Sequence, residues 1–171
     1  MHTQTLTVNQ LSPSELAAWR GLLRVHSALV HELDRELEEA HGLPLTHYEV
    51  LLYLEAAPDH RLRMAELASS VLLSQSGVTR LVDRLERDGL VAREPCPDDK
   101  RGLLATLTPS GLRRLEEARP THLVGVRRRF LAFFDERELR SLGDAWERVR
   151  PGITDCEGPR AARPRGAARV A

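Results

Sequence analysis

Apolar residues in the N-terminal part of this chain recur with the period of an α-helix. Ser12 can cap a helix and Pro13 suits its first position. From there apolar side chains return at spacings of three and four, which predicts one helix of about 28 residues. We expect Gly42 and Pro44 to end it. The seam consists of Leu16, Trp19, Leu23, His26, Val30, Leu33, Leu37 and Ala40.

The middle of the chain predicts short elements in quick succession, because its apolar runs are brief and turn residues separate them. Gly89 has the place of a left-handed helix end. The expected elements are a helix over residues 46–57 with Thr46 as its cap, a short strand over 62–64, and helices over 65–69 and 74–88.

Two strands with alternating patterns follow, over residues 90–93 and 104–107. The charged segment from Pro95 to Gly102 separates them and predicts a hairpin loop too long for a two-residue turn. Thr108 and Pro109 then begin another long helix, which Pro120 should kink.

A last helix is expected over residues 136–150.

The order of the predicted elements between residues 46 and 107 is that of a winged helix-turn-helix. We therefore expect a mainly α fold with a small β-hairpin wing, a winged helix-turn-helix joined to a helical dimerisation region. The expected parts are a flexible arm over 1–11, the dimerisation region over 12–44 and 109–150, a DNA-binding winged domain over 45–108, and a disordered tail rich in Arg, Ala and Pro over 151–171.

The predicted helix over residues 74–88 has an apolar and a polar side. Val78, Leu81, Val82 and Leu85 form the apolar side. Short polar side chains suit hydrogen bonds to base edges, and arginine reaches guanine or phosphate. Any amphipathic surface helix has a polar face. Taken alone, this face therefore fits an ordinary solvent-exposed helix as well as it fits a DNA-contacting one. The residues that we expect to contact DNA are Ser74, Gln75, Ser76, Thr79, Arg80 and Arg84.

The tip of the predicted hairpin favours the DNA-binding interpretation. Lys100 and Arg101 lie together there, preceded by Asp99. An arginine on a thin extension beside a recognition helix can enter the adjacent minor groove. Asp99 is unsuited to contact phosphate, so we expect it to pair with Arg101 or Arg84 and orient it.

These motifs, at their mutual spacing, resemble the MarR (multiple-antibiotic-resistance regulator) family of bacterial repressors over residues 12–150. The motifs are SQSGVTRLVDRLE at 74–86, Gly89-Leu90-Val91, Asp99-Lys100-Arg101, and Leu107-Thr108-Pro109 followed by Gly111. The resemblance implies a homodimeric transcriptional regulator, a probable repressor in the family's pattern, on a pseudo-palindromic operator in double-stranded DNA. It assigns the family's minor-groove arginine to Arg101 and its wing aspartate to Asp99.

A dimer also follows from the apolar pattern. The long N-terminal seam and the last two helices carry more apolar surface than two short helices and a hairpin can cover. We therefore expect a second copy to bury it across a twofold interface. The two winged domains should then lie one turn of DNA apart, roughly 34–36 Å.

The resemblance further implies release by a small anionic or aromatic effector, in a crevice between the dimer helices and the winged domain. The candidates are Trp19, His26, His47 and Tyr48. The competing interpretations are a core histidine at His26 and a solvent-exposed one at His47.

Metal and redox sensing are alternatives, because some members of the family sense zinc or peroxide. His26, His47 and His122 are the one conceivable zinc set, and we predict neither a metal site nor a cofactor. Cys96 is expected to be partly exposed at the wing, where its oxidation could disturb DNA binding. Cys156 forms no C-x-x-C pair with it.

Composition narrows the function further. Basic and acidic residues balance at 25 each, so a basic surface must be local. All basic residues except Lys100 are arginine, which suggests the GC-rich genome of an actinobacterium.

The sequence lacks the common catalytic motifs, a secretory signal and a membrane span, so we expect a cytoplasmic protein that is not an enzyme. A winged helix used for protein contacts is the other alternative, although it has no reason to bring Arg80, Arg84 and Arg101 onto one surface.

Overall fold

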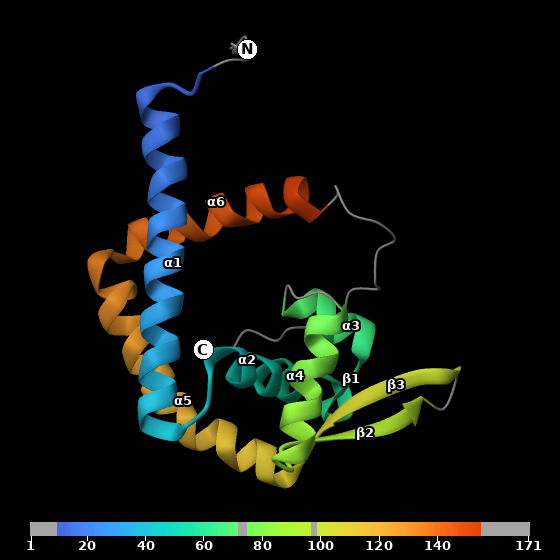
Figure 1. The fold of residues 1–171 in the computed structure, drawn as a ribbon. Helices are drawn as coiled ribbons and strands as arrows, with labels where there is room; N and C mark the ends of the chain where they lie inside the picture. The colour runs from blue at the N-terminus through green and yellow to red at the C-terminus, as the bar shows by residue number, and fades with distance from the viewer. Residues whose placement is uncertain (1–9, 72–74, 97–98, 155–171) are drawn as a thin grey trace.

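The computed structural model describes residues 10–71, 75–96 and 99–154. Six helices and a small antiparallel sheet make up this part of the chain, which confirms the predicted mainly α winged helix-turn-helix (Figure 1). The elements are α1 (Pro13–His41), α2 (Leu45–Ala56), β1 (Arg61–Arg63), α3 (Met64–Ser70), α4 (Gln75–Arg87), β2 (Val91–Cys96), β3 (Asp99–Leu107), α5 (Pro109–Arg129) and α6 (Glu136–Thr154). Short 3₁₀ turns at Pro58–His60 and Leu131–Phe133 connect neighbouring elements.

The ends of α1 are capped as the sequence predicts. Ser12 and Glu15 form a reciprocal capping box, in which the Glu15 carboxylate accepts from the Ser12 amide at 2.8 Å. Gly42 ends the helix with a left-handed φ of 57°, and its amide donates to the Glu38 carbonyl. Both ends of this long helix are therefore defined by local sequence.

The start of α2 differs from the prediction, because Thr46 lies inside the helix and caps nothing. Pro44 has the N-cap position and offers no side-chain acceptor. Instead, the Asp34 carboxylate of α1 accepts the Leu45 amide at 2.8 Å. A residue eleven positions away thus takes the place of a local cap and ties α2 to α1.

The sheet has the strand order β1-β3-β2, with both pairs antiparallel. Its last β2–β3 pair joins Cys96 to Asp99, so the predicted open loop from Pro95 to Gly102 is wrong. The register jumps from the Pro95–Leu103 pair to the Cys96–Asp99 pair. Residues 100–102 therefore bulge out of the ladder on the β3 side.

One apolar core joins the winged part to the helices. Leu51, Leu54 and Leu67 are fully buried between α2 and α3. The apolar side of α4 packs onto them as predicted, with Val78 and Val82 completely buried. Leu115 of α5 and Leu37 of α1 belong to the same core, which fixes the winged part against the long helices.

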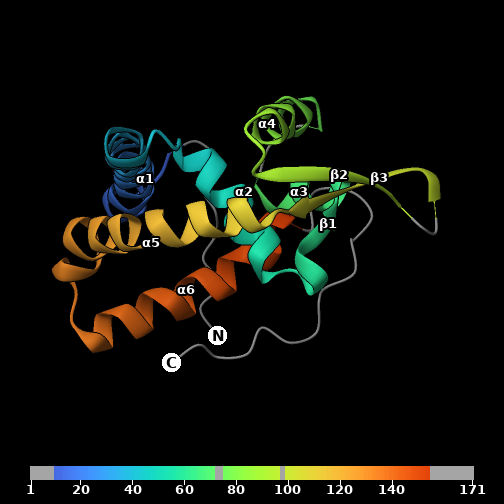
Figure 2. The same cartoon turned by 90° about the horizontal axis from the view of Figure 1, so that it is seen from below.

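Helices α1 and α5 run close together along one side of the molecule (Figures 1 and 2). Gly125 permits this approach, because a Cβ there would lie 2.7 Å from the Leu33 side chain. Arg129 of α5 also pairs with the carboxylates of Glu32 and Glu36 on α1. The helix continues through Pro120, and Figure 1 shows that α5 curves along its length.

The last helix, α6, has no extensive contact with the other described elements of its own chain. In the view of Figure 1 it passes behind α1, and Trp146 and Val149 are exposed. It continues to Thr154, beyond the expected end at residue 150, and the rest of the predicted tail lies outside the described residues, as does most of the expected arm over 1–11. None of the described helices combines the length and apolar character that a membrane span requires.

Candidate nucleic-acid interface

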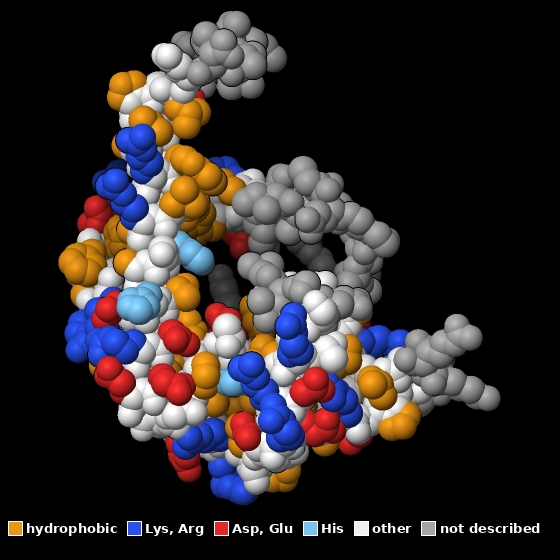
Figure 3. All heavy atoms as spheres, viewed as in Figure 1, with side chains coloured by type: hydrophobic (Ala, Val, Ile, Leu, Met, Phe, Trp, Pro, Cys, Tyr) orange, Lys and Arg blue, Asp and Glu red, His pale blue; other side chains and the backbone are white. Residues whose placement is uncertain are grey.

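Helix α4 presents a polar face away from the core. Ser76, Thr79, Arg80 and Arg84 are all exposed, whereas Leu81 and Leu85 are buried beneath them. Figure 3 shows basic side chains along this helix, with acidic ones beside them. The Arg80 Nε donates to the Ser76 carbonyl at 3.3 Å, which lays this guanidinium along the outer face of the helix.

Several predicted contacts fall where the structure is described only in part. Ser74 lies outside the described residues. Gln75 begins α4, and Asp99, Lys100 and Arg101 belong to β3, but their side chains are not described. Their roles, including the expected Asp99 pairing with Arg101 or Arg84, therefore stay predictions.

The backbone still places the two predicted wing cations in an informative position. Lys100 and Arg101 lie within the bulge of β3, where the strand leaves its ladder with β2. Bulges redirect side chains and are frequent next to functional sites. The wing extends away from the helices on the same side of the molecule as α4 (Figure 1).

Arg93 of β2 joins the wing to α4, and sequence reasoning did not assign it a role. Its guanidinium donates to the Thr79 carbonyl at 3.0 Å and pairs with Asp83 at 2.6 Å and Glu86 at 3.0 Å. The side chain is only 19% exposed. Its only sequence signal was an arginine at the end of the otherwise apolar segment 90–93, after a helix with carboxylates three residues apart at Asp83 and Glu86.

A second junction joins the wing to the long helices. Thr108 caps α5 by accepting from the Gly111 amide at 3.0 Å, and its hydroxyl reaches the carbonyls of Gly89 at 2.7 Å and Leu90 at 3.0 Å. The Thr108 amide also donates to the Leu90 carbonyl at 3.1 Å. A Cβ at Gly111 would lie 2.1 Å from that carbonyl oxygen, so this position accepts glycine alone without a backbone shift.

The four candidate effector residues do not share one environment. Trp19 is 53% exposed and His26 is exposed, both on α1. His47 and Tyr48 are buried on α2, so the competing interpretation of His47 as a solvent-exposed histidine is wrong. Arg84, near the end of α4, and Asp88, just after it, act on His47 electrostatically. The expected burial of His26 on the apolar seam is likewise absent within the single chain.

Two histidines lie in the interior, since His47 of α2 is buried and His122 of α5 is half-buried. Desolvation lowers the pKa of His47 below its ordinary value, with nearby Asp88 opposing the shift. Desolvation also lowers the pKa of His122, whose ring lies 4.5 Å from that of Tyr48. In the described part of the structure, His47 Nε2 and His122 Nδ1 are buried without a hydrogen-bond partner. Burial therefore favours the neutral form of both imidazoles.

This burial predicts a pH-dependent stability. Since the folded pKa lies below the unfolded one, the unfolded chain binds more protons as pH falls below about 6.5. We expect the free energy of unfolding to be at its highest above pH 7 with respect to these histidines. It should decrease on acidification, by at most about 1.4 kcal/mol per pH unit for each histidine. His47→Leu should flatten this slope in urea titrations, whereas His31→Gln, at an exposed position of α1, should leave it unchanged. An equal slope in His47→Leu would refute the assignment.

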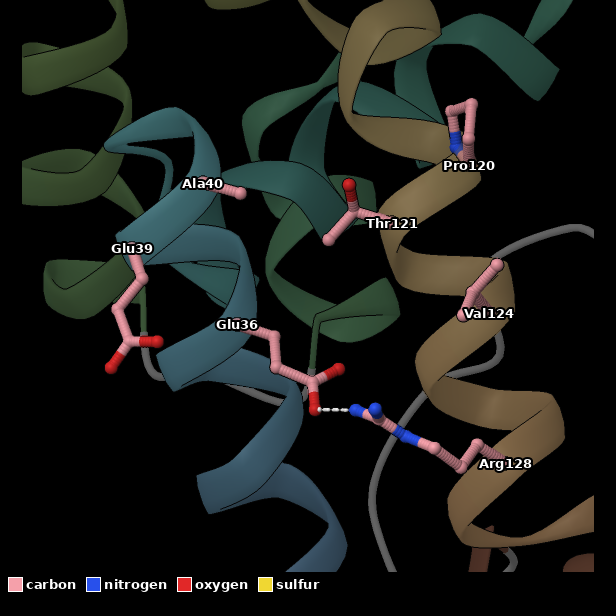
Figure 4. Close-up of a pocket in the computed structure, with 7 residues that line it drawn as sticks. All are labelled: Glu36, Glu39, Ala40, Pro120, Thr121, Val124 and Arg128. Atoms are coloured by element: carbon pink, nitrogen blue, oxygen red, sulfur yellow. Dashed lines mark hydrogen bonds and ion pairs between the residues drawn. The ribbon is translucent and has the colours of Figure 1, made fainter.

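Two shallow hollows lie along α5, away from the effector candidates. The larger, of about 550 Å³, is bounded by α1 and α5, and its Glu36 pairs with Arg128 (Figure 4). Glu39, Ala40, Pro120, Thr121 and Val124 complete its lining. The second hollow lies on the other side of Pro120 and Val124. Neither contains Trp19, His26, His47 or Tyr48.

Metal and redox chemistry find no support in the described part of the chain. There, no three His, Cys, Asp or Glu side chains lie close enough to hold a metal ion, so His26, His47 and His122 do not form the conceivable zinc set. Cys96 is buried at 6% exposure, which corrects the expectation of a partly exposed thiol. Cys96 is the last residue of β2 that pairs with β3.

Known proteins share this architecture. The MarR family model matches residues 41–102. The transcriptional repressor YetL of Bacillus subtilis is 30% identical over 146 residues, which cover 84% of this chain and 87% of YetL. The chain belongs to the MarR family. Two solved MarR-family structures from Streptomyces coelicolor resemble it, both with a TM-score of 0.80. AbsC is 33% identical over 85% of this chain and 98% of its own. Sco3205, solved in complex with DNA, is 35% identical over 84% and 94%.

Membership in the MarR family confirms the resemblance drawn from the motifs around α4 and the wing. These relatives are transcriptional regulators by name. The chain is accordingly a MarR-family transcriptional regulator with a winged helix-turn-helix, in which α4 has the place of the recognition helix and β2–β3 form the wing.

Proposed function

We propose that this MarR-family chain is a homodimeric repressor that binds a pseudo-palindromic operator in double-stranded DNA. The observation that carries the proposal is the exposed polar face of α4 beside a wing that bulges at Lys100 and Arg101. A recognition helix in the major groove and an arginine in the minor groove would then read one half-site together. The DNA complex of Sco3205 and the repressor name of YetL support it.

The proposed contacts divide between positioning and reading. Ser74, Gln75, Ser76 and Thr79 at the start of α4 are suited to base edges, and Arg80 and Arg84 to guanine or phosphate. In the wing, Arg101 would enter the minor groove, Lys100 would contact phosphate, and Asp99 would orient an arginine. The four parts expected from the sequence, with residues 45–108 as the DNA-binding domain, form the frame of this proposal.

In-vitro selection from random duplex DNA at physiological salt tests the proposal. We expect an inverted repeat whose half-sites lie about one helical turn apart. Recovery of no enriched sequence would contradict sequence-specific binding by the free protein. A protein-contact module, the competing interpretation, predicts that outcome.

The dimer is inferred from helices that their own chain leaves uncovered. Trp19 and Trp146 are 53% and 43% exposed, and α6 has no extensive contact with the other described elements. Figure 3 shows apolar side chains gathered along α1, in the part of the view where α6 passes behind it. Contiguous apolar surface of this kind marks an association site. A second copy, placed by a twofold axis, would cover α1 and α6 and set two α4 helices on one face of DNA.

Disruption of the apolar face of α6 should separate the proposed dimer. Trp146→Glu places a charge on this face, and burial of an unpaired carboxylate at an interface is costly. We expect wild-type protein to sediment as a dimer at micromolar concentration and the variant as a monomer. Arg148→Glu is the matched control, since it lies about 200° around the helix from Trp146. A monomeric wild type, or a dimeric Trp146→Glu, would refute this interface.

Effector release is the finer part of the proposal. Tyr48 and His47 are buried, so a small aromatic acid that binds there would have to displace existing packing, such as the contact of Tyr48 with His122 of α5. Trp19 and His26 would join such a site from α1 of either subunit. Titration of small aromatic carboxylates against the protein–operator complex reads out this release directly.

A further inference from the structure

Arg93 is the one described wing side chain that clasps the recognition helix at three points. Its guanidinium contacts the Thr79 carbonyl, Asp83 and Glu86, at 3.0, 2.6 and 3.0 Å. The Arg93 amide adds a fourth contact, to the other oxygen of the Glu86 carboxylate, at 3.3 Å. We call these contacts the Arg93 clasp.

The spacing of its partners explains the effect of the clasp on geometry. Thr79, Asp83 and Glu86 are four and three residues apart, so they form one stripe along two turns of α4. A single fork-shaped guanidinium that holds this stripe limits both rotation of α4 about its axis and tilt against β2. The buried face of α4 packs in the same apolar core as Val91 of β2 and Leu107 of β3. The clasp adds directional polar contacts between α4 and the wing to this non-directional packing.

The clasp also has an electrostatic consequence. Asp83 and Glu86 place two carboxylates on a helix that carries the exposed Arg80 and Arg84. Next to a phosphate backbone these carboxylates would oppose binding. Arg93 pairs with both, and with 19% of its side chain exposed it is screened less than a surface ion pair.

We infer that Arg93 is a positioning residue that sets the recognition helix and the wing at one fixed angle, so that major-groove and minor-groove contacts form together. The consequence for DNA rests on the proposed function, whereas the clasp itself does not. Arg93 would touch neither base nor phosphate. It acts through the placement of Arg80 and Arg84 relative to the bulge at residues 100–102.

The first test is independent of DNA. Hydrogen exchange of the free protein should accelerate in Arg93→Met for peptides from α4 and β2–β3, and stay unchanged in α1 and α5. Arg87→Met is the matched control, because it removes the same charge from α4, where Arg87 contacts only the Asp83 carbonyl among the partners described for it. Unchanged exchange in α4 and the wing of Arg93→Met would overturn the inference. Faster exchange throughout the chain would also overturn it, since the effect would then be global.

The second test separates positioning from charge on the selected operator. Loss of hydrogen bonds to charged groups should weaken Arg93→Met binding by about tenfold to a hundredfold. Minor-groove protection at the half-site ends should fade more than major-groove protection. The triple variant Arg93→Met, Asp83→Asn, Glu86→Gln should stay weak, whereas full recovery would assign Arg93 to charge neutralisation alone. If wild type binds no duplex but exchange responds as expected, the proposed function fails and the clasp stands.

Discussion

Gly111→Ala should destabilise the folded protein by about 2–3 kcal/mol, although alanine is ordinarily the better helix former. The added Cβ would lie 2.1 Å from the Leu90 carbonyl oxygen and 2.8 Å from the Leu107 side chain. The carbonyl cannot withdraw freely, because it accepts both the amide and the hydroxyl of Thr108. The start of α5 would therefore have to separate from the wing.

The matched control, Gly21→Ala, should change the stability in the opposite direction. At Gly21 of α1 a Cβ meets nothing within 4 Å, so Gly21→Ala should stabilise the protein by roughly 0.5–1 kcal/mol through helix propensity. Urea unfolding followed by circular dichroism, at one protein concentration to hold association constant, measures both variants. A Gly111→Ala variant as stable as wild type would show that the junction yields without cost.

This junction has a consequence for function as well as for stability. The wing and α4 connect to the long helices through Thr108 and Gly111, in the same short segment where α5 begins. A change in the angle between α5 and α1, the helix that runs along it, would therefore move the wing directly. The Leu-Thr-Pro-x-Gly motif thus has a steric reason that the sequence alone did not reveal.

Arg101→Ala should weaken operator binding by roughly 1–3 kcal/mol, or about fivefold to 150-fold. The reason is the loss of a cation from the narrow minor groove, where the negative potential is greatest. Fluorescence anisotropy with the selected duplex measures this loss. Because the contact is proposed to enter the groove, the loss should be greater on A·T-rich half-site ends than on G·C-rich ones.

Arg148→Ala controls for the loss of one positive charge. It removes an arginine from α6, away from α4 and the wing (Figure 1), and should leave affinity within about 0.5 kcal/mol of wild type. Equal affinities of Arg101→Ala and wild type would remove the minor-groove assignment. A loss that is the same for every flanking sequence would make Arg101 a phosphate contact instead.

The local patterns of the sequence predicted much of this fold. The apolar side of α4, the Ser12 cap, the Gly42 and Gly89 helix ends and the Thr108-Pro109 start of α5 all follow from residues within one or two turns. Such features need no knowledge of distant contacts, because periodicity and capping depend on the chain's own neighbours.

The errors lie where distant residues decide. Thr46 looked like a cap, but Asp34 supplies the acceptor from α1. His47 looked exposed in a first helical turn, but only 9% of it is accessible to solvent. The wing's bulge depends on strand register, and the Arg93 clasp joins residues up to fourteen positions apart. The spacing of apolar and polar residues in one sequence does not show which distant residues will pair.

A change in half-site spacing tests the central claim most directly. A dimer that holds two winged domains at a fixed separation should bind the selected inverted repeat as two chains per duplex. Insertion of about 5 base pairs between the half-sites turns one of them to the opposite face of the helix, and affinity should fall toward the non-specific level, by about 10³-fold or more. Binding that is indifferent to this insertion, or one chain per duplex, would contradict the account.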